Sequence, residues 1–346
     1  MNFDVIDFSN KAMWNEIVKN GEVYYQWQYV DAFFKNGDGI PKLAFAELNG
    51  EYIYNVFLVR DIAKDLNLDE EKYNCFDIIT PYGYGGTYTK SNNKDLVIYF
   101  FRSFEQYCQQ NKIIAEFIRF NPLLNNYELY NNDEYKLENI SKTVYIKLDD
   151  PEQIWNDMEG RCRTSIRKAQ KNNLVIKSGF DRETLEEFIN IYQETMKRDS
   201  ADEYYFFNDD FFESILNNLK SFAKIYTVYY NGKAINSSII MFNGKNAHYH
   251  LSGTLSEYMK LGANNYALYE IALDLCKMGY EKFHLGGGYG GDNSPLFKFK
   301  MSFNKFGELD FYIGKKIWNN EIYLKLCKEL NIDQETNFFP AYRRGE

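Results

Sequence analysis

The three histidines of this chain lie near one another in the sequence, and imidazole is the side-chain group that most readily accepts a proton near neutral pH. His248 and His250 share one strand-like run, where alternation places both on one face and Tyr249 on the other. His284 lies on a second strand-like run. No thiol or carboxylate joins them at ligand spacing, which disfavours a zinc site. The pattern predicts either a proton-accepting site or hydrogen-bonded histidines of a protein core.

A strand, loop, helix and strand over 247–288 would position these histidines. In the helical stretch, Leu268, Ala272 and Leu275 share a face, and Gly279 is the expected terminator. A helix that connects two strands favours a parallel, right-handed crossover. We therefore expect the two histidine-bearing strands to run parallel in one sheet.

The loop at 259–265 precedes that helix. Backbone N–H groups and the positive end of the helix dipole face outward at such a point, so the loop could hold an anionic group. The alternative is a polar turn in which Asn264 or Asn265 caps the helix.

The same order of elements occurs twice in the chain. Asn49-Gly50 and Asn231-Gly232 each favour a tight hairpin between two strand-like runs. Each hairpin is followed by a strand, a loop, a helix and a strand, and the first copy has its glycine-rich loop at 81–86. The repeat predicts two similar α/β lobes built on mixed sheets.

A basic helix is predicted between the two copies, starting near 149–152. Its apolar stripe consists of Trp155, Met158, Cys162, Ile166 and Ala169, and its basic face of Arg161, Arg163, Arg167, Lys168 and Lys171. The basic face is either solvated or in contact with phosphate groups. A final amphipathic helix is expected over 317–330, followed by a partly loose terminus.

Composition narrows the class of protein. The chain has 346 residues, 45% of them apolar, which suits about two globular domains. A net charge of -9 argues against DNA binding and requires a local basic patch for any RNA contact. Five cysteines without a CxxC pair fit reduced intracellular thiols. Without a leader-like start or a long apolar stretch, the sequence predicts a cytoplasmic protein with no membrane span.

Four features of the chain together resemble the Fem family of peptidoglycan-bridge aminoacyltransferases, within the GNAT acyltransferase superfamily. They are the order of elements, RTSIRKAQKNNLVI at 163–176, PYGYGG at 81–86 and LFKFKMSF at 296–303. The likeness spans nearly the whole chain and implies two GNAT-like lobes, each a mixed sheet flanked by helices. The acceptor-side lobe would comprise 1–148 and 317–346, and the donor-side lobe 149–316. The chain resembles the smaller family members, which have no coiled-coil arm.

The resemblance implies a donor site in the second lobe. Its residues would be Leu261, Gly262, Ala263, Asn264, Asn265, Phe299, Arg167 and Lys168. Met259 and Asn264 replace two signature residues of the GNAT loop that holds the pyrophosphate of coenzyme A. That departure weakens the prediction of coenzyme A binding.

The resemblance also implies the reacting groups. In Fem proteins a Phe-Lys pair lies at the reactive end of the donor, and Phe299-Lys300 matches it, with Phe297-Lys298 as a competing pair. Lys300 would then polarise the acyl carbonyl. His250 or His248 would act as a base or bind the acceptor, between strands that splay apart in GNAT lobes.

Strand alternation over 297–303 would place Lys298 and Lys300 on one face and the phenylalanines on the other. The glycine-rich run at 286–291 would form a mobile lip over the cleft. Residues in acceptor-binding positions are Tyr82, Tyr84, Gly85, Arg198, Tyr205 and Tyr249. For the loop at 81–86, a simple tight turn is the alternative.

The expected function is transfer of an aminoacyl or acyl group, from aminoacyl-tRNA or acyl-CoA, to an amine of a bacterial cell-envelope precursor. The precursor would be a peptidoglycan stem peptide or an amino sugar, free or lipid-linked, and no tightly bound cofactor is expected. No Ser-His-Asp or Cys-His signature is present, which favours direct attack by the amine. The alternative is a catalytically silent scaffold in envelope polysaccharide synthesis.

Overall fold

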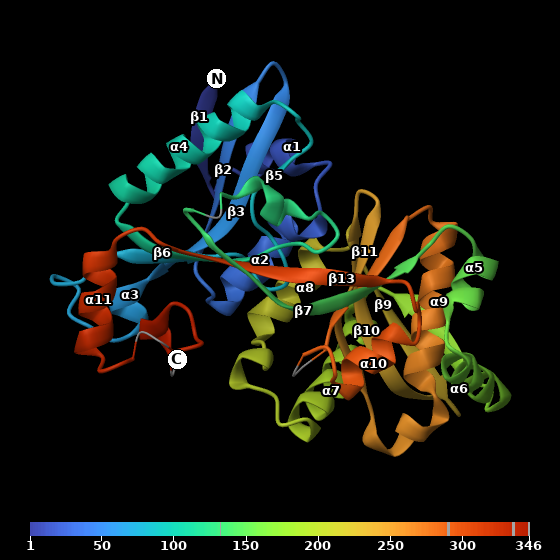
Figure 1. Cartoon of the computed structure of the whole chain (residues 1–346). Coiled ribbons are helices and arrows are strands. Elements are labelled where there is room, and N and C mark those ends of the chain that lie inside the picture. The colour runs from blue at the N-terminus through green and yellow to red at the C-terminus, as the bar shows by residue number, and fades with distance from the viewer. Residues whose placement is uncertain (132, 289–290, 334–335, 345–346) are drawn as a thin grey trace. The chain divides into compact units, whose positions relative to one another are not determined.

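The computed structural model describes residues 1–131, 133–288, 291–333 and 336–344 (Figure 1). They form two compact units. The first unit comprises Met1–Lys19, Tyr24–Ile140 and the chain from Phe311 onward; the second comprises Asn20–Val23 and Ser141–Asp310. The sequence placed the two main boundaries a few residues later, at 148 and 316.

The first unit is built on a mixed sheet with the strand order β1 (Asn2–Asp7), β2 (Ile40–Leu48), β3 (Glu51–Asp61), β4 (Phe76–Ile79), β6 (Ile113–Arg119) and β13 (Glu308–Ile317). Only β4 and β6 run parallel, and the short β5 (Tyr88–Thr89) pairs with β3. Helix α4 (Lys94–Gln110) makes the crossover between β4 and β6. It lies along one face of this sheet (Figure 1). The other helices of the unit are α1 (Lys11–Val18), α2 (Trp27–Asn36), α3 (Ile62–Asp65) and α11 (Asn320–Glu329).

The second unit repeats this plan, as predicted. Its strand order is β7 (Lys136–Lys147), β12 (Lys282–Gly287), β11 (Asn246–Thr254), β10 (Lys233–Asn243), β9 (Ala223–Tyr230) and β8 (Val175–Gly179), and only β11 and β12 run parallel. Helix α9 (Ala263–Lys277) makes the crossover. The other helices are α5 (Pro151–Asp157), α6 (Gly160–Lys171), α7 (Arg182–Arg198), α8 (Asp209–Asn218) and α10 (Pro295–Met301).

Local turn chemistry accounts for the shared plan. Both Asn-Gly turns adopt positive φ at both residues, 53° and 83° at Asn49-Gly50 and 49° and 80° at Asn231-Gly232. This backbone matches the twist of a two-residue hairpin, and asparagine and glycine tolerate it best. Each turn fixes the register of its strands, and the predicted hairpins are confirmed.

The core of the second unit lies between its sheet and helices α5, α6 and α9. The predicted face of α9 is buried, with Leu268, Ala272 and Leu275 all at 0% exposure. Gly279 follows the helix with φ of +86°, in the terminator role expected for it. Helix α7 packs on β9, β10 and β11 with residues outside this core cluster, and so covers the opposite face.

The basic helix is interrupted, contrary to prediction. Met158 and Glu159 are extended, so α5 ends at Asp157 and α6 begins at Gly160. The Arg163 guanidinium donates to the Trp155 and Met158 carbonyls and so satisfies the exposed end of α5. The apolar stripe still faces the core: Trp155 is half-buried and its other four members are buried.

The segment at 295–301 is a helix, so the predicted strand alternation is wrong there. The Ser294 side chain caps it by accepting from the Phe297 N–H, and Pro295 occupies the first helical turn, where its missing N–H costs nothing. Helical spacing buries Phe297 and Lys300 together and exposes Lys298. The two lysines therefore lie on different faces.

The C-terminal segment also differs from prediction. Helix α11 begins at Asn320 because Ile317 still belongs to β13. The tail is not loose: Ala341, Tyr342 and Arg343 are at most 1% exposed.

Candidate active site

The two histidine-bearing strands part at His248 and His284, forming what we call the fork. Within the described chain, β11 and β12 pair at three positions, Asn246↔Lys282, Ala247↔Phe283 and His248↔His284, although both strands continue further. Each strand has a bulge just past this point. In the pairing of β11 with β10 the extra residue is His250, and in the pairing of β12 with β7 it is Leu285. Such bulges bend a strand away from its neighbour.

Two of the histidines face each other at the base of the fork. The His248 and His284 rings are 5.7 Å apart, centroid to centroid, and nearly perpendicular. Tyr249 points to the helix side, where its hydroxyl donates to Asn264 Oδ1 at 3.1 Å. His248 and Tyr249 therefore occupy opposite faces, as alternation predicts. His250 does not continue this alternation, because it is the extra residue of the bulge.

A carboxylate that the sequence did not indicate completes this group. Glu22 Oε2 lies 2.8 Å from His248 Nε2, and Glu22 Oε1 accepts from Asn246 Nδ2 at 2.6 Å. Glu22 is 5% exposed and His248 is 1% exposed. No local pattern marks Glu22, since its partner lies 226 positions along the chain.

Lys300 is buried at the β12 side of the fork. Its Nζ donates to the Gly287 carbonyl at 2.7 Å, and the residue is 8% exposed. Gly287 ends β12, past the point where the strands part. The predicted reacting lysine therefore lies beside the opening between the strands.

Burial determines the electrostatics of the group. It lowers the pKa of Lys300 from 10.5 to about 8, because removal from water penalises the ammonium form. Burial lowers the pKa of His250 to about 3, and a proton on neighbouring His248 would contribute to the same effect. The pKa of His284 falls well below its usual value, first through burial and then through the charge of Lys300 and the charge that His248 carries when protonated. At neutral pH, Lys300 is mostly charged while His250 and His284 are neutral.

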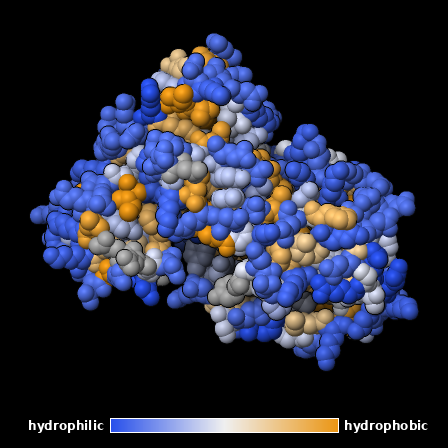
Figure 2. Space-filling model, in the orientation of Figure 1, coloured by the Kyte–Doolittle hydropathy of each residue, from blue (hydrophilic) through white to orange (hydrophobic). Residues whose placement is uncertain are grey.

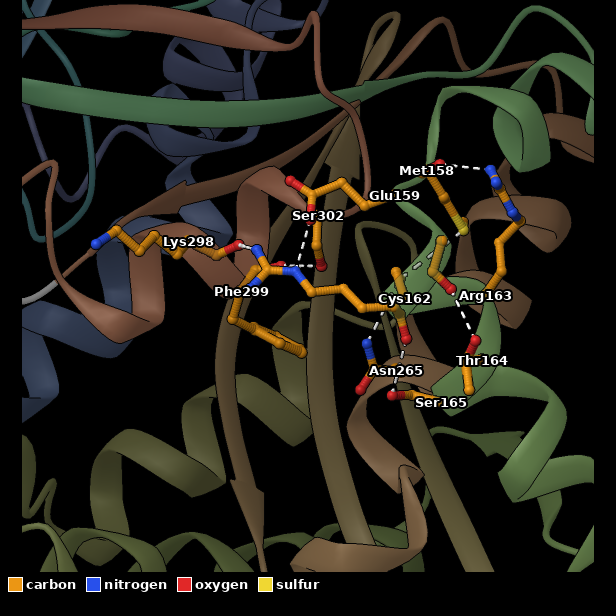
Figure 3. A network of polar contacts seen from close by, with 12 residues as sticks. Met158, Glu159, Cys162, Arg163, Thr164, Ser165, Asn265, Lys298, Phe299 and Ser302 are labelled. Carbon is orange, nitrogen blue, oxygen red and sulfur yellow. Dashed lines mark hydrogen bonds and ion pairs between the residues drawn. The ribbon is translucent and has the colours of Figure 1, made fainter.

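The predicted donor loop is covered on one side by α6. Gly262 has φ of +78°, and a Cβ placed on it would lie 2.6 Å from the Ser165 carbonyl oxygen. Asn265 Nδ2 donates to Cys162 Sγ at 3.4 Å (Figure 3). Helix α9 begins directly after Gly262, so Asn264 and Asn265 are not its caps but residues of its first turn. This close packing explains why glycine stands at position 262.

Comparison with known proteins concerns the fold that holds this site. Residues 158–300 match the family model described as an acetyltransferase (GNAT) domain. The chain is similar to the crystal structure of FemX, with a TM-score of 0.66 and 15% identity over 94% of this chain and 99% of that one. The chain therefore has the fold of the FemX structure, and its residues 158–300 match a GNAT domain.

Two further structures share the fold of this chain. The C-terminal domain of a putative lysylphosphatidylglycerol synthetase from Agrobacterium fabrum has a TM-score of 0.60 and 12% identity, over 91% of this chain and 93% of that one. A conserved protein of unknown function from Bacteroides thetaiotaomicron has a TM-score of 0.59 and 13% identity, over 91% and 99%. No curated protein sequence matches the chain.

Replacing Gly262 by alanine in this GNAT domain should destabilise it more than the same change at Gly279. Both residues have positive φ, which costs about 1–2 kcal/mol for a residue with a Cβ. Only at Gly262 would the Cβ also meet a backbone carbonyl, because Gly279 has open space around it. The urea midpoints of the two variants measure the difference. Equal midpoints would show that α6 does not pack closely on this loop.

Most of the basic helix face is engaged inside the GNAT domain. Arg161 donates to the Lys298 carbonyl and pairs with Glu159, at the end of α10 where Phe299 and Ser302 lie (Figure 3). The Arg167 guanidinium stacks on the Trp155 ring at 5.2 Å. Lys168 and Lys171 are exposed. The two basic residues predicted to bind donor are both exposed, and Arg167 also lies over the Trp155 ring of its own domain.

The glycine-rich loop at 81–86 lies at the ends of β4 and β6, the strand pair of the first unit that corresponds to β11 and β12. Thr80 N donates to the Phe117 carbonyl, Thr80 Oγ1 accepts from Arg119 N, and Gly85 N donates to the Arg119 carbonyl at 2.7 Å. The parallel strand pair therefore differs between the two units. The loop at 81–86 keeps β4 and β6 connected by hydrogen bonds, whereas β11 and β12 separate.

Aromatic side chains pack this loop. The Tyr29 hydroxyl donates to the Tyr82 carbonyl, and the Tyr84 ring makes edge contacts with Tyr24 and Phe311. Burial raises the pKa of Tyr84 above its usual value. The acceptor-binding role of Tyr82, Tyr84 and Gly85 stays a prediction, as does that of Tyr249.

Arg198 and Tyr205 lie near the end of β11. Arg198 Nη1 donates to the Thr254 carbonyl at 2.6 Å, and its Nε pairs with Asp199 at 2.7 Å. The Tyr205 carbonyl accepts from the Tyr192 hydroxyl. The Arg198 contacts join α7 to the end of β11, and an acceptor role for either residue stays a prediction. The predicted lip at 286–291 includes residues 289–290, which lie outside the described residues.

The described residues contain no further site of the common kinds. No group of three or more histidine, cysteine or carboxylate side chains there could hold a metal ion, and no helix there has the length and apolar content to cross a bilayer. The face drawn in Figure 2 is mainly hydrophilic, with apolar residues in small groups. A cavity of about 410 Å³ in the first unit, lined by residues such as Lys315, Tyr323 and Phe339, contains none of the predicted site residues.

Proposed function

We propose that this protein transfers an aminoacyl or acyl group from an activated ester or thioester donor to the amine of a cell-envelope precursor. The observation that carries the proposal is the fork, with a buried lysine at its β12 side. The opening between β11 and β12 admits the donor, whose reacting carbonyl lies near Lys300. The names of two similar structures, FemX and a putative lysylphosphatidylglycerol synthetase, support envelope chemistry.

The chemistry is direct attack of the amine nitrogen on the acyl carbon. Negative charge develops on the carbonyl oxygen in the transition state, and the Lys300 ammonium stabilises it in a site with little water. A covalent intermediate on cysteine is disfavoured because burial raises the pKa of all five thiols and keeps them protonated. The amine therefore attacks without a protein nucleophile.

Structural details favour an aminoacyl ester over an acyl-CoA as the donor. The loop before α9 lacks two signature residues of coenzyme A binding, and α6 places the Ser165 carbonyl against Gly262. A carbonyl oxygen repels a pyrophosphate, which would otherwise bind the N–H groups of this turn. The match to an acetyltransferase family model is the observation that favours acyl-CoA.

A thermal-shift screen with coenzyme A, acyl-CoAs and charged tRNAs tests the donor. A ligand that binds only the folded state at a hundred times its Kd adds about 2.7 kcal/mol to stability, so the bound donor should raise Tm measurably. We expect a charged tRNA to do so, followed by its discharge when an amine-bearing peptidoglycan precursor is added. A shift with coenzyme A alone would overturn the aminoacyl donor. Binding without discharge of any donor would favour a silent scaffold.

A further inference from the structure

The Glu22–His248 pair joins two segments that are distant in sequence. Asn20–Val23, which we call the N-terminal strap, belongs to the second unit although the chain before and after it belongs to the first. The strap is held by Asn243, whose Nδ2 donates to the Gly21 carbonyl at 2.7 Å, and by the two contacts of Glu22. The only carboxylate of the strap is thus fixed at the base of the fork.

The contacts of Glu22 determine how the imidazole of His248 is used. A carboxylate accepts hydrogen bonds, so His248 Nε2 carries the hydrogen toward Glu22 Oε2 and Nδ1 keeps its lone pair. Proton uptake at Nδ1 would create an imidazolium beside a carboxylate, which favours the charged form. This is the arrangement by which a buried carboxylate orients and supports an imidazole base.

Other titratable groups also lie near His248. Around it stand Glu22 from the strap, His250 from its own strand and His284 from β12, while Lys300 of α10 acts on His284. Burial and positive neighbours hold the pKa values of His250 and His284 below the physiological range. The contact with the Glu22 carboxylate therefore marks His248 as the histidine placed to take up a proton.

We propose that Glu22 and His248 form the proton-accepting pair of the fork, in which His248 takes up a proton from the acceptor amine and Glu22 is its positioning residue. The proposal rests on the function proposed above. The acceptor ammonium gives one proton to His248 Nδ1, directly or through one water, and its nitrogen lone pair then forms the C–N bond. A second N–H proton passes to the leaving oxygen or sulfur as the C–O or C–S bond breaks. His248 returns its proton to solvent.

Nitrogen-15 NMR of the histidine side chains tests the pair in the full chain without any substrate. With three histidines, each imidazole is assigned from single His→Asn variants. We expect His248 to be the Nε2–H tautomer and to have the highest protonation midpoint of the three. In Glu22→Gln, which preserves the shape of the side chain, that midpoint should fall because the negative charge is gone.

A control variant and a pH profile test whether the change at His248 comes from Glu22. Glu281→Gln removes an exposed carboxylate that pairs with Lys245, and it should leave all three midpoints unchanged. Once a donor is known, the acid limb of kcat/KM should move to lower pH in Glu22→Gln. An unchanged His248 midpoint, a higher midpoint at His250 or His284, or an acid limb that stays in place would each overturn the proposal. Failure to turn over any donor would overturn the proposed function, while the NMR result would still test the pair.

Discussion

Replacing Lys300 by methionine should reduce acyl transfer by about 10²–10³-fold, the usual loss when one oxyanion-stabilising donor is removed. The methionine side chain fills similar space without a charge. Stability should change little, because the lost hydrogen bond to Gly287 is offset by removal of a buried ammonium group. The measurements are kcat/KM with the donor found by the thermal-shift screen and Tm for folding.

Lys298 provides the matched control for this change. It lies two positions away on the same helix, is exposed, and competes with Lys300 in the sequence motif. Lys298→Met should keep activity within about twofold, since exposed side chains outside a site contribute little. If both variants lose activity equally, or neither does, Lys300 is not the charge that stabilises the transition state.

The pH profile of the same reaction distinguishes the charged role of Lys300 from a role as a base. Its pKa is lowered to about 8, so the ammonium form dominates at pH 7 and is lost as pH rises through 8. A charge-stabilising lysine predicts activity that falls above about pH 8, whereas a basic lysine predicts activity that rises. The alkaline limb should be absent from the residual activity of Lys300→Met.

Replacing Asp77 by asparagine should lower the free energy of unfolding by about 3–5 kcal/mol, the usual cost of breaking a buried ion pair. Asp77 is fully buried and accepts from Arg343 Nε at 2.5 Å, Arg60 Nε at 2.7 Å and the Tyr342 hydroxyl at 2.9 Å. Arg343 is itself 1% exposed. Without the carboxylate at position 77, much of the compensation for this buried guanidinium is lost, although Asp65 still accepts from it.

The effect should be confined to the first unit, which contains this network. Hydrogen exchange should accelerate at the amides of β3 and β4 and stay unchanged at those of β10 and β11. Arg182→Met breaks an exposed pair with Glu213 and should cost less than about 1 kcal/mol. If the two variants lose equal stability, the C-terminal tail is not held by buried charges.

Much of the fold could be predicted because its signals are local. An Asn-Gly pair favours its turn whatever surrounds it, and the spacing of Leu268, Ala272 and Leu275 defines a helix face within a few turns. The parallel crossover then follows from connecting two strands through a helix. The helix boundaries at Gly160 and Pro295, which differ from the predictions, also have local causes, because a glycine and a Ser-Pro pair each favour a helix boundary.

The sequence by itself determined the two-lobed α/β plan and the three histidines beside the second crossover, and its resemblance to the Fem family predicted Lys300 as the reacting lysine. Only the tertiary structure decided the surroundings of these groups: their burial, their charged neighbours and their hydrogen-bond partners. The fork depends on bulges in two strands, the electrostatics of Lys300 on its burial, and the choice among the histidines on Glu22. Burial and ion pairing join residues hundreds of positions apart, and no periodicity or spacing within one segment records such contacts.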